Sequence, residues 1–470
     1  MRAVRRSPDT PKGRRRAFPL FVLGVAISVA SLAPGHAASQ PQRADAAVQA
    51  FTNAVLIDGT GAAAIEHATI VVRGDRIVSA GRAASVSVPS GARVTDLRGK
   101  VLMPGLADMH VHLMGGWDGV ATDMLGYRRY MNALLYAGVT TVLDTGNVEP
   151  FIVQLRAEVA AGRLLGPRIY CVGPLIDGAD PAWPPLSRAV SSVAQVPDVV
   201  RALGRDHVDL IKAYVGLSHP VLARLVEEGH KVSLRVIIDQ WQRNGSPDLV
   251  ADGIYGFAHL PTRKLSSSDV ELMRDRQVAF ISTLSVFESQ SRRRLGKLAF
   301  LQDPLVRDTT PPGFLDGLRA EAARQLPSAE VERAQRWVGL LQNAMDNARA
   351  LFQSGVLLTA GTDAPYPGDM QGEGLHRELE LLVEAGFAPL EAISIATQNA
   401  AHFIGANDWG TIQPGKLATL IIVDGRPDRD ISQTRKVVGV YIAGRQIDRD
   451  SLQLSRQNDP GFRPISPVDF

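Results

Sequence analysis

The hydrophobic residues of this chain fall into short runs that are separated by segments of helical length. Between about residues 101 and 405, apolar runs of strand length, such as 140–144 and 356–360, alternate with these longer segments. Such an alternation is typical of parallel strands joined by helical crossovers. About eight repeats in ~300 residues favour a closed barrel over an open doubly wound sheet. We therefore predict an α/β fold, with a (β/α)8 TIM-like barrel at residues 104–405.

Two shorter β-rich regions lie at the ends of the chain. Strand-like runs at 54–59 and 69–78 precede the barrel, and runs at 420–423 and 437–442 follow it. Neither region is long enough to bury a hydrophobic core alone, so we expect the two regions to pair. The sequence thus predicts a small composite β-sandwich domain, formed by residues 38–103 and 406–470.

The first 37 residues have the pattern of a targeting segment. Seven basic side chains and one acidic side chain are followed by an uncharged stretch at 17–33 and then by small residues. That stretch is too short for a membrane span of ~20 apolar residues, although an uncleaved anchor remains the alternative. We predict a signal peptide at residues 1–37, with Arg15 and Arg16 resembling a twin-arginine signal. The mature protein is then periplasmic or secreted, without membrane contact.

Charge and composition exclude several classes of function. The net charge is +3, but the leader carries 7 − 1 = +6, which leaves 3 − 6 = −3 for the rest of the chain. The basic residues therefore give no argument for nucleic-acid binding. Cys171 is the only cysteine, which excludes an intrachain disulfide framework and a Cys-rich zinc site. No glycine-rich phosphate-binding motif opens a helix, which disfavours nucleotide-binding versions of the α/β class.

The first candidate for chemistry is the pair His110 and His112. Because side chains alternate along a strand, two histidines separated by one residue point to the same face. At the C-terminal end of a barrel strand both imidazoles would reach the mouth, where such barrels hold their active sites. Imidazole is the commonest metal ligand in proteins, so the pair indicates a metal site. Two structural histidines would explain the pair about as well.

Three further side chains stand at the ends of other predicted strands, namely Lys212, His259 and Asp363. Each has an ordinary explanation on its own: a solvated lysine, a satisfied core histidine and a turn-forming aspartate. Their joint occurrence on one barrel favours a metal-dependent active site. Beside metals, the lysine amine can take up carbon dioxide as a carbamate and bridge two cations.

These residues and their flanking motifs together resemble the amidohydrolase superfamily. The closest branch is that of imidazolonepropionase-like proteins and Xaa-Pro dipeptidases. The resemblance rests on Pro104-Gly105-Leu106-Ala107-Asp108-Met109-His110-Val111-His112, Lys212, His259, Gly361-Thr362-Asp363-Ala364 and the motif from Gly410 to Ala418. It covers roughly residues 51–447 and is more specific for the fold than for the substrate.

The resemblance implies a zinc enzyme with one or two ions. His110, His112 and Asp363 would bind the inner ion, and a carboxylated Lys212 with His259 would hold the outer one. Asp363 would orient the attacking water, accept its proton and pass it to the leaving nitrogen. The implied activity is hydrolysis of a carbon–nitrogen bond in a small amide, cyclic amide or dipeptide by metal-activated water. The oligomeric state stays open, a homo-oligomer included.

One position departs from the family pattern. The family has a further histidine at the end of the strand after the lysine, and here Asp239 stands there, with Arg235 as the competing candidate. A guanidinium offers a metal no lone pair, whereas a carboxylate can bind zinc. We therefore predict Asp239 as a ligand, with an aspartate that merely ends a strand as the alternative. Such an oxygen would favour a harder cation such as manganese, or accompany loss of the outer metal.

Other functions stay open on the sequence alone. A non-catalytic extracytoplasmic binding protein could use the same barrel, and a lactone or ester hydrolase would share the metal chemistry. The presence of all five family residues favours the enzyme. We expect loops at 114–118, 214–218 and 366–372, with Trp117, Tyr214 and Tyr366, to build the substrate pocket. The charged segment 289–342 is either a lid over the barrel mouth or a surface insertion.

Overall fold

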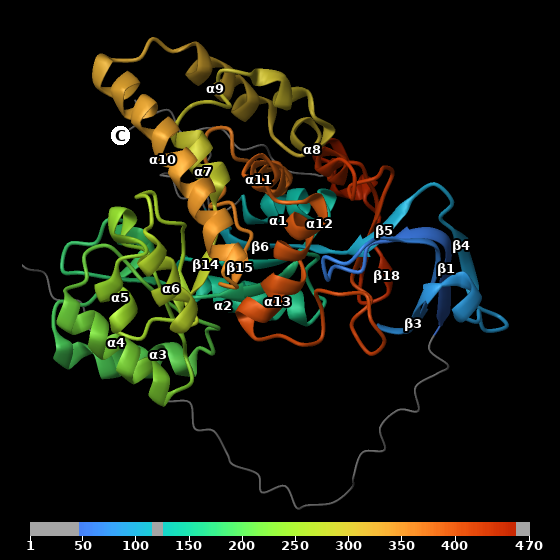
Figure 1. Ribbon diagram of the computed structural model, residues 1–470, viewed down its shortest axis with the longest axis horizontal. Helices are drawn as coiled ribbons and strands as arrows, with labels where there is room; N and C mark the ends of the chain where they lie inside the picture. The colour runs from blue at the N-terminus through green and yellow to red at the C-terminus, as the bar shows by residue number, and fades with distance from the viewer. Residues whose placement is uncertain (1–46, 115–125, 457–470) are drawn as a thin grey trace, which may run out of the picture. The chain divides into compact units, whose positions relative to one another are not determined.

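The computed structural model describes residues 47–114 and 126–456 (Figure 1). The predicted leader at 1–37 lies outside the described residues, as do Trp117 and most of the loop at 114–118. Within the two described ranges, no helix is both long enough and apolar enough to cross a membrane.

Eight parallel strands form a closed barrel. They are β6 (Leu106–Val111), β7 (Val139–Asp144), β8 (Arg168–Cys171), β11 (Ile211–Ala213), β12 (Val236–Ile238), β13 (Gly256–Phe257), β14 (Ala279–Ile281) and β15 (Leu358–Thr359). Strands β6 to β8 pair as one group and β11 to β15 as another. The amide of Asp209 donates to the carbonyl of Cys171 at 2.8 Å, and that of Met109 to Ala360 at 2.9 Å, which joins the groups on both sides. The predicted (β/α)8 barrel is confirmed.

Helices surround the barrel strands (Figure 1). They are α1 (Tyr127–Tyr136), α2 (Phe151–Ala160), α3 (Val196–Arg205), α4 (His219–Lys231), α5 (Pro247–Ala251), α6 (Ser267–Asp275), α7 (Leu284–Gln290), α10 (Ser328–Gln353), α11 (Glu373–Glu384), α12 (Pro389–Ile395) and α13 (Gln398–Ile404). On α3, the buried side chains Val196, Val200 and Leu203 recur at helical spacing, so one apolar face covers the strands. The strands are mostly apolar because their faces are largely buried, with polar exceptions such as His110 on β6 and Lys212 on β11. Two short strands, β9 (Leu175–Asp177) and β10 (Ser187–Ala189), continue the sheet beside β11.

The strand predicted before Asp239 is shorter than the apolar run suggests. Helix α4 extends to Lys231, and Ser233 has a φ of +60°, so the chain turns before β12 begins at Val236. The earlier apolar residues belong to this turn. Asp239 nevertheless follows the strand directly, as predicted.

The charged segment 289–342 packs beside the barrel mouth. It contains α8 (Pro304–Arg307), α9 (Pro312–Ala323) and the first half of α10. A small apolar cluster of its own includes Leu301, Val306 and Leu318, together with Met370 from the loop after β15. This shared cluster joins the segment to a loop that the sequence places at the mouth.

The chain ends form one mixed sheet of eight strands. They are β1 (Val48–Leu56), β2 (Ile65–Arg73), β3 (Arg76–Arg82), β4 (Arg93–Asp96), β5 (Val101–Pro104), β16 (Leu420–Val423), β17 (Val437–Ile442) and β18 (Arg445–Gln446). The order is β18-β17-β16-β5-β1-β2-β3, with β4 also paired to β1. Antiparallel pairing of β16 with β5, for example Leu420 with Pro104, joins the two ends. The predicted pairing of the two end regions is confirmed.

Candidate metal centre

The six side chains predicted from the sequence lie at the C-terminal end of the barrel strands. His110 and His112 are on and just after β6, Lys212 is on β11, Asp239 follows β12, His259 follows β13 and Asp363 follows β15. Because the strands are parallel, their C-terminal ends meet at one rim of the barrel. The structure therefore brings together residues that are up to 253 positions apart (363 − 110).

Three of these residues form a compact group. The Nε2 atoms of His110 and His112 lie 3.2 and 3.1 Å from Oδ1 of Asp363. Within the described residues, these three are the group of histidine, cysteine and acidic side chains whose ligand atoms all lie within 4.8 Å of one another. Two imidazole nitrogens and one carboxylate oxygen are a donor set that zinc accepts.

Local structure fixes the orientation of both imidazoles. Nδ1 of His110 lies 2.8 Å from the carbonyl of Ala258, and Nδ1 of His112 lies 3.0 Å from that of Gly146. A carbonyl oxygen can only accept, so both Nδ1 atoms carry hydrogen. In a neutral imidazole, Nε2 then presents a lone pair to Asp363. Two acceptors attract each other at this distance only with a proton or a metal cation between them, so the residues fit a bound metal ion.

A glycine lets the last strand approach the first. A Cβ atom at Gly361 would lie 2.9 Å from the backbone nitrogen of His110 and 2.5 Å from Ile281. Only glycine therefore fits between these neighbours. The amide of Asp363, at a φ of +71°, then donates to the carbonyl of His110 at 2.7 Å. This close contact places the carboxylate beside the two histidines.

Asp239 and His259 form a pair next to the compact group. Oδ2 of Asp239 lies 3.2 Å from Nε2 of His259, whose ring centre is 4.5 Å from that of His110. Arg235 instead packs against the ring of Tyr255, with its guanidinium carbon 4.0 Å from the ring centre. Asp239 and Arg235 were the two candidates for the position where the family has a further histidine. The structure brings Asp239 to the centre and leaves Arg235 away from it.

Lys212 is almost fully buried, with 2% of its surface exposed. Its Nζ lies 3.2 Å from Nε2 of His110. Burial lowers the pKa of the Lys212 amine below its ordinary value, although Asp239 and Asp363 work in the opposite direction. A lowered pKa makes the neutral, nucleophilic amine more accessible.

The histidines and carboxylates influence each other strongly. Burial, together with the charge of Lys212, lowers the pKa of His110 to about 3. Burial alone would raise the pKa of Asp363, but its contacts with His110 and His112 hold it well below the ordinary value. Asp239 likewise has a lowered pKa because His259 and Lys212 outweigh its burial. Both carboxylates are therefore anionic, as ligands for a cation must be.

Two residues that support the centre were not assigned from the sequence. Asp108 is buried and accepts hydrogen bonds from the amide and hydroxyl of Thr362, at 3.0 and 2.8 Å. The Nε2 of Gln371 donates to the carbonyls of His112 and Ala364, both at 3.0 Å. Asp108 is two residues before His110 on the same strand, so the spacing already placed both side chains on one face and could have identified Asp108. No spacing or motif marks Gln371.

Aromatic side chains border the centre on one side. Of the predicted loop aromatics, Tyr214 has its ring centre 5.6 Å from Nζ of Lys212. Burial, followed by the charge of Asp363, raises the pKa of Tyr366 well above its ordinary value. The indole nitrogens of Trp183 and Trp241 both approach the Tyr214 hydroxyl. The two tryptophans were not predicted.

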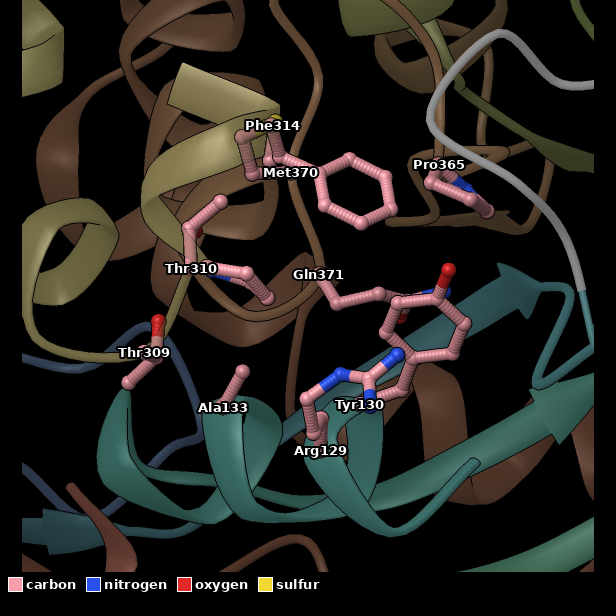
Figure 2. A pocket seen from close by; sticks show the side chains of 10 residues that line it. Arg129, Tyr130, Ala133, Thr309, Thr310, Phe314, Pro365, Met370 and Gln371 are labelled. Atoms are coloured by element: carbon pink, nitrogen blue, oxygen red, sulfur yellow. The ribbon is translucent and has the colours of Figure 1, made fainter. Parts of the chain in front are cut away.

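A pocket adjoins the centre through Gln371 (Figure 2). Its lining comes from α1 (Arg129, Tyr130, Ala133), from the segment before and within α9 (Thr309, Thr310, Pro311, Phe314) and from the loop after β15 (Pro365, Met370, Gln371). The rings of Phe314 and Tyr130 lie on opposite sides of it (Figure 2). The segment 289–342 therefore contributes to a cavity wall at the mouth.

Comparison with known proteins shows what this arrangement is similar to. A model of the amidohydrolase family matches residues 101–218 and 319–447. An adenine deaminase of Nitratidesulfovibrio vulgaris (strain DP4) is 36% identical over 115 residues, which cover 23% of this chain and 19% of that protein. An imidazolonepropionase of Shouchella clausii (strain KSM-K16) is 24% identical over 438 residues, covering 85% of this chain and 92% of that protein.

The solved structures agree on the fold. A Xaa-Pro dipeptidase, crystallised with methionine bound in its active site, superposes with a TM-score of 0.68 at 21% sequence identity. The superposition covers 85% of this chain and 100% of that one. The matched segments contain the two histidines, Lys212 and Asp363 of the centre. The chain belongs to the amidohydrolase family.

Proposed function

We propose that this protein is an exported, metal-dependent hydrolase of a carbon–nitrogen bond in a small amide, cyclic amide or dipeptide. The observation that carries the proposal is the convergence of two histidine nitrogens, Nε2 of His110 and of His112, on one carboxylate oxygen of Asp363. Membership of the amidohydrolase family supports the reaction class.

His110, His112 and Asp363 would hold one metal ion, and Asp239, His259 and Lys212 supply donors for a second position. Zinc suits the nitrogen-rich inner set. When bound, zinc lowers the pKa of a coordinated water toward ~7 and polarises a substrate carbonyl. Nδ1 of each inner histidine stays tied to a backbone carbonyl, so the imidazoles keep the tautomer that leaves Nε2 for the metal.

Asp363 carries the proton in the proposed reaction. Oδ1 faces His110 and His112, whereas Oδ2 lies 3.9 Å from Nε2 of His259. The carboxylate accepts a proton from the attacking water and delivers it to the leaving nitrogen, because an amine must be protonated to depart. The hydrogen bond from its own amide to His110 keeps the carboxylate in place during both transfers.

Lys212 is proposed as the site of carbamylation. The ammonium first gives up one proton. The neutral amine then attacks carbon dioxide, a nitrogen–carbon bond forms and a second proton is released, so that a buried cation becomes an anionic oxygen donor. The supporting observation is the burial of this side chain. Burial lowers the pKa of the Lys212 amine, although the charges of Asp239, Asp363 and Asp144 act in the opposite direction. Carbon-13 NMR of protein exchanged into labelled bicarbonate reports the carbamate directly.

The test of the reaction class is a screen of N-acyl amino acids and Xaa-Pro dipeptides with zinc-loaded protein. Loss of a positioned proton carrier costs about 10²- to 10⁴-fold in rate, so we expect Asp363→Asn to lose turnover by this factor with its fold retained. Asp408→Asn, a carboxylate at the opposite end of the barrel, is the matched control. Absence of hydrolysis across both sets with zinc and with manganese, or full activity in Asp363→Asn, would contradict the proposal.

We also propose that residues 1–37 direct export of the protein. The supporting observation is the basic, then apolar, then small-residue order of the leader. Cell fractionation followed by N-terminal sequencing should find the mature chain outside the cytoplasm and beginning after Ala37. A cytoplasmic protein with an intact N-terminus would contradict export.

A further inference from the structure

Trp241 is an unusual residue beside the candidate metal centre. It is 57% exposed, more than any other large apolar side chain among the described residues. Its φ of +49° is in the left-handed region, which bulky side chains avoid. Exposure and backbone conformation are both unfavourable here. Such outliers persist where the surroundings impose them, and they cluster at ligand-binding sites.

The turn that carries Trp241 is anchored to the centre. The amide of Trp241 donates to Oδ1 of Asp239 at 3.0 Å, and the amide of Gln240 donates to Oδ1 of Asn244 at 2.9 Å. The other oxygen of Asp239 faces His259. One carboxylate therefore contacts the centre and holds the turn, which fixes the position of the indole relative to the metal ligands.

Trp241 is the exposed end of a row of aromatic side chains, in which Tyr214 is buried. Its Nε1 lies 3.4 Å from the Tyr214 hydroxyl, which also accepts a hydrogen bond from Nε1 of Trp183 at 2.9 Å. The rings of Trp241 and Tyr214 meet at 90°, with their centres 6.4 Å apart. Tyr214 in turn lies against Lys212. Aromatic carbon thus extends from the metal ligands to the exposed indole.

A second tryptophan shows that the indole–phenol hydrogen bond does not explain this exposure. Trp409 donates its Nε1 to the hydroxyl of Tyr170 at 3.0 Å, at the other end of the barrel. There the indole is only 6% exposed. The same bond therefore forms without leaving the ring in solvent.

We propose that Trp241, supported by Tyr214 and Trp183, forms an aromatic subsite that binds a flat apolar ring of the substrate. The inference rests on the proposed function and adds a substrate class: amides that carry an aromatic ring. A ring placed on the exposed indole buries apolar area on both partners, and the aromatic pair adds a favourable edge or offset contact. A methyl group in the same place covers little of the indole.

The subsite is tested with probes that the enzyme does not hydrolyse. Two pairs of zinc-binding compounds differ only in the ring: benzohydroxamate with acetohydroxamate, and phenylalanine hydroxamate with alanine hydroxamate. Isothermal titration of zinc-loaded protein should show the ring-bearing member binding about tenfold more tightly in at least one pair. The two pairs place the ring at different distances from the metal.

Three variants assign this preference to the indole. Trp241→Ala should reduce the ratio to less than about threefold while the acetohydroxamate affinity and zinc content stay unchanged. Trp241→Phe keeps a ring but removes the hydrogen bond to Tyr214, and should retain most of the preference. Trp409→Phe removes the equivalent hydrogen bond at the far end and should leave the ratio as in the wild type.

The outcomes separate this inference from the proposed function. Binding of acetohydroxamate without a ring preference, or a preference that survives in Trp241→Ala, would overturn the aromatic subsite alone. Failure of zinc-loaded protein to bind any of the four compounds would overturn the proposed function and the subsite with it. If Trp241→Ala does not fold, loss of the ratio in Trp241→Lys, checked by circular dichroism, decides the same point.

Discussion

The two ends of the barrel differ in how their charged and polar side chains are paired. At the N-terminal end, where β8 begins, Arg168 lies 3.3 Å from Asp408, and the Trp409 indole donates to Tyr170. Each of these four side chains has a partner of complementary character. At the C-terminal end, Nε2 of His110 and Nε2 of His112 converge on one oxygen of Asp363, a carboxylate that can only accept.

The difference distinguishes groups that stabilise the fold from groups that bind a ligand. Complementary pairs complete their interactions within the protein. Converging acceptors are favourable only when a proton or a metal cation joins them, so their free energy depends on what is bound. The N-terminal end therefore makes its contribution to stability with or without metal, whereas the C-terminal end should respond to metal.

Removal of metal should produce the largest effect. We expect a chelator to abolish hydrolysis completely and zinc to restore it. Because a ligand at about 1,000 times its dissociation constant stabilises a protein by about 4 kcal/mol, the chelated protein should also unfold at a lower temperature. Calorimetry with and without chelator measures this difference. Unchanged activity and unfolding temperature after verified metal removal would mean that the two ends do not differ as described.

A buried ion pair near the C-terminal end of the barrel tests whether stability depends on pairing or on position in the barrel. Glu373 begins α11 and is fully buried between Arg294 and Arg435. Breaking a buried pair costs about 3 kcal/mol, which is the loss we expect in the unfolding free energy of Glu373→Gln. Glu384→Gln, whose partner Arg293 is half-exposed, should lose less than about 1 kcal/mol. Equal urea midpoints for the two variants would contradict this.

The same glutamate predicts a pH dependence. Burial alone would raise the pKa of Glu373, but Arg294 and Arg435 lower it to about 2, from the ordinary 4.5. A carboxylate with a lowered folded-state pKa stabilises the protein above its unfolded value, and this stabilisation is lost as the pH falls. The stability difference between wild type and Glu373→Gln should therefore be full above about pH 4.5 and shrink toward pH 2. A difference that grows on acidification would refute the assignment.

A variant of Asp239 tests whether this residue, which stands where the family has a histidine, contributes to metal binding. We expect Asp239→Ala to weaken zinc binding by about 10- to 100-fold, the usual effect of losing an outer ligand or its support. Competition with a fluorescent chelator measures this affinity. Asp209→Ala, in a carboxylate paired with Arg156 away from the centre, is the control. Unchanged zinc affinity and content in Asp239→Ala would argue against ligation.

The smallest effect is expected at the N-terminal end of the barrel. Arg168 and Asp408 are 39% and 34% exposed, so solvent screens their attraction. Asp408→Asn should therefore change the free energy of unfolding by less than about 1 kcal/mol and leave metal content unaffected. A larger loss, or a change in zinc binding, would remove the contrast between the two ends.

The sequence predicted what depends on local pattern. Alternating apolar runs identified the barrel, and positions at strand ends identified His110, Lys212 and Asp363, because parallel strands bring their C-terminal ends together. The pairing of β5 with β16 followed from two regions that could not bury a core alone. Asp239, not Arg235, reached the centre because only the former follows its strand.

Other features depend on contacts between distant segments. The apolar run before Asp239 suggested a long strand, but Ser233 has a left-handed backbone conformation. No glycine or asparagine at this position indicated it in the sequence. Gln371 joins two strand ends through a loop without a motif. Trp241 gained its position from a hydrogen bond to Asp239, so its place beside the candidate metal centre required the folded turn.

Metal analysis of the purified, zinc-reconstituted protein tests the central claim most directly. After gel filtration, the wild type should retain at least one equivalent of zinc by plasma mass spectrometry, and His110→Asn/His112→Asn should retain none while keeping its circular dichroism spectrum. The buried structural histidine His376, bound to Thr434 and Ala137, provides the control variant His376→Asn. A wild type without zinc, or a double variant that binds it equally well, would contradict the account.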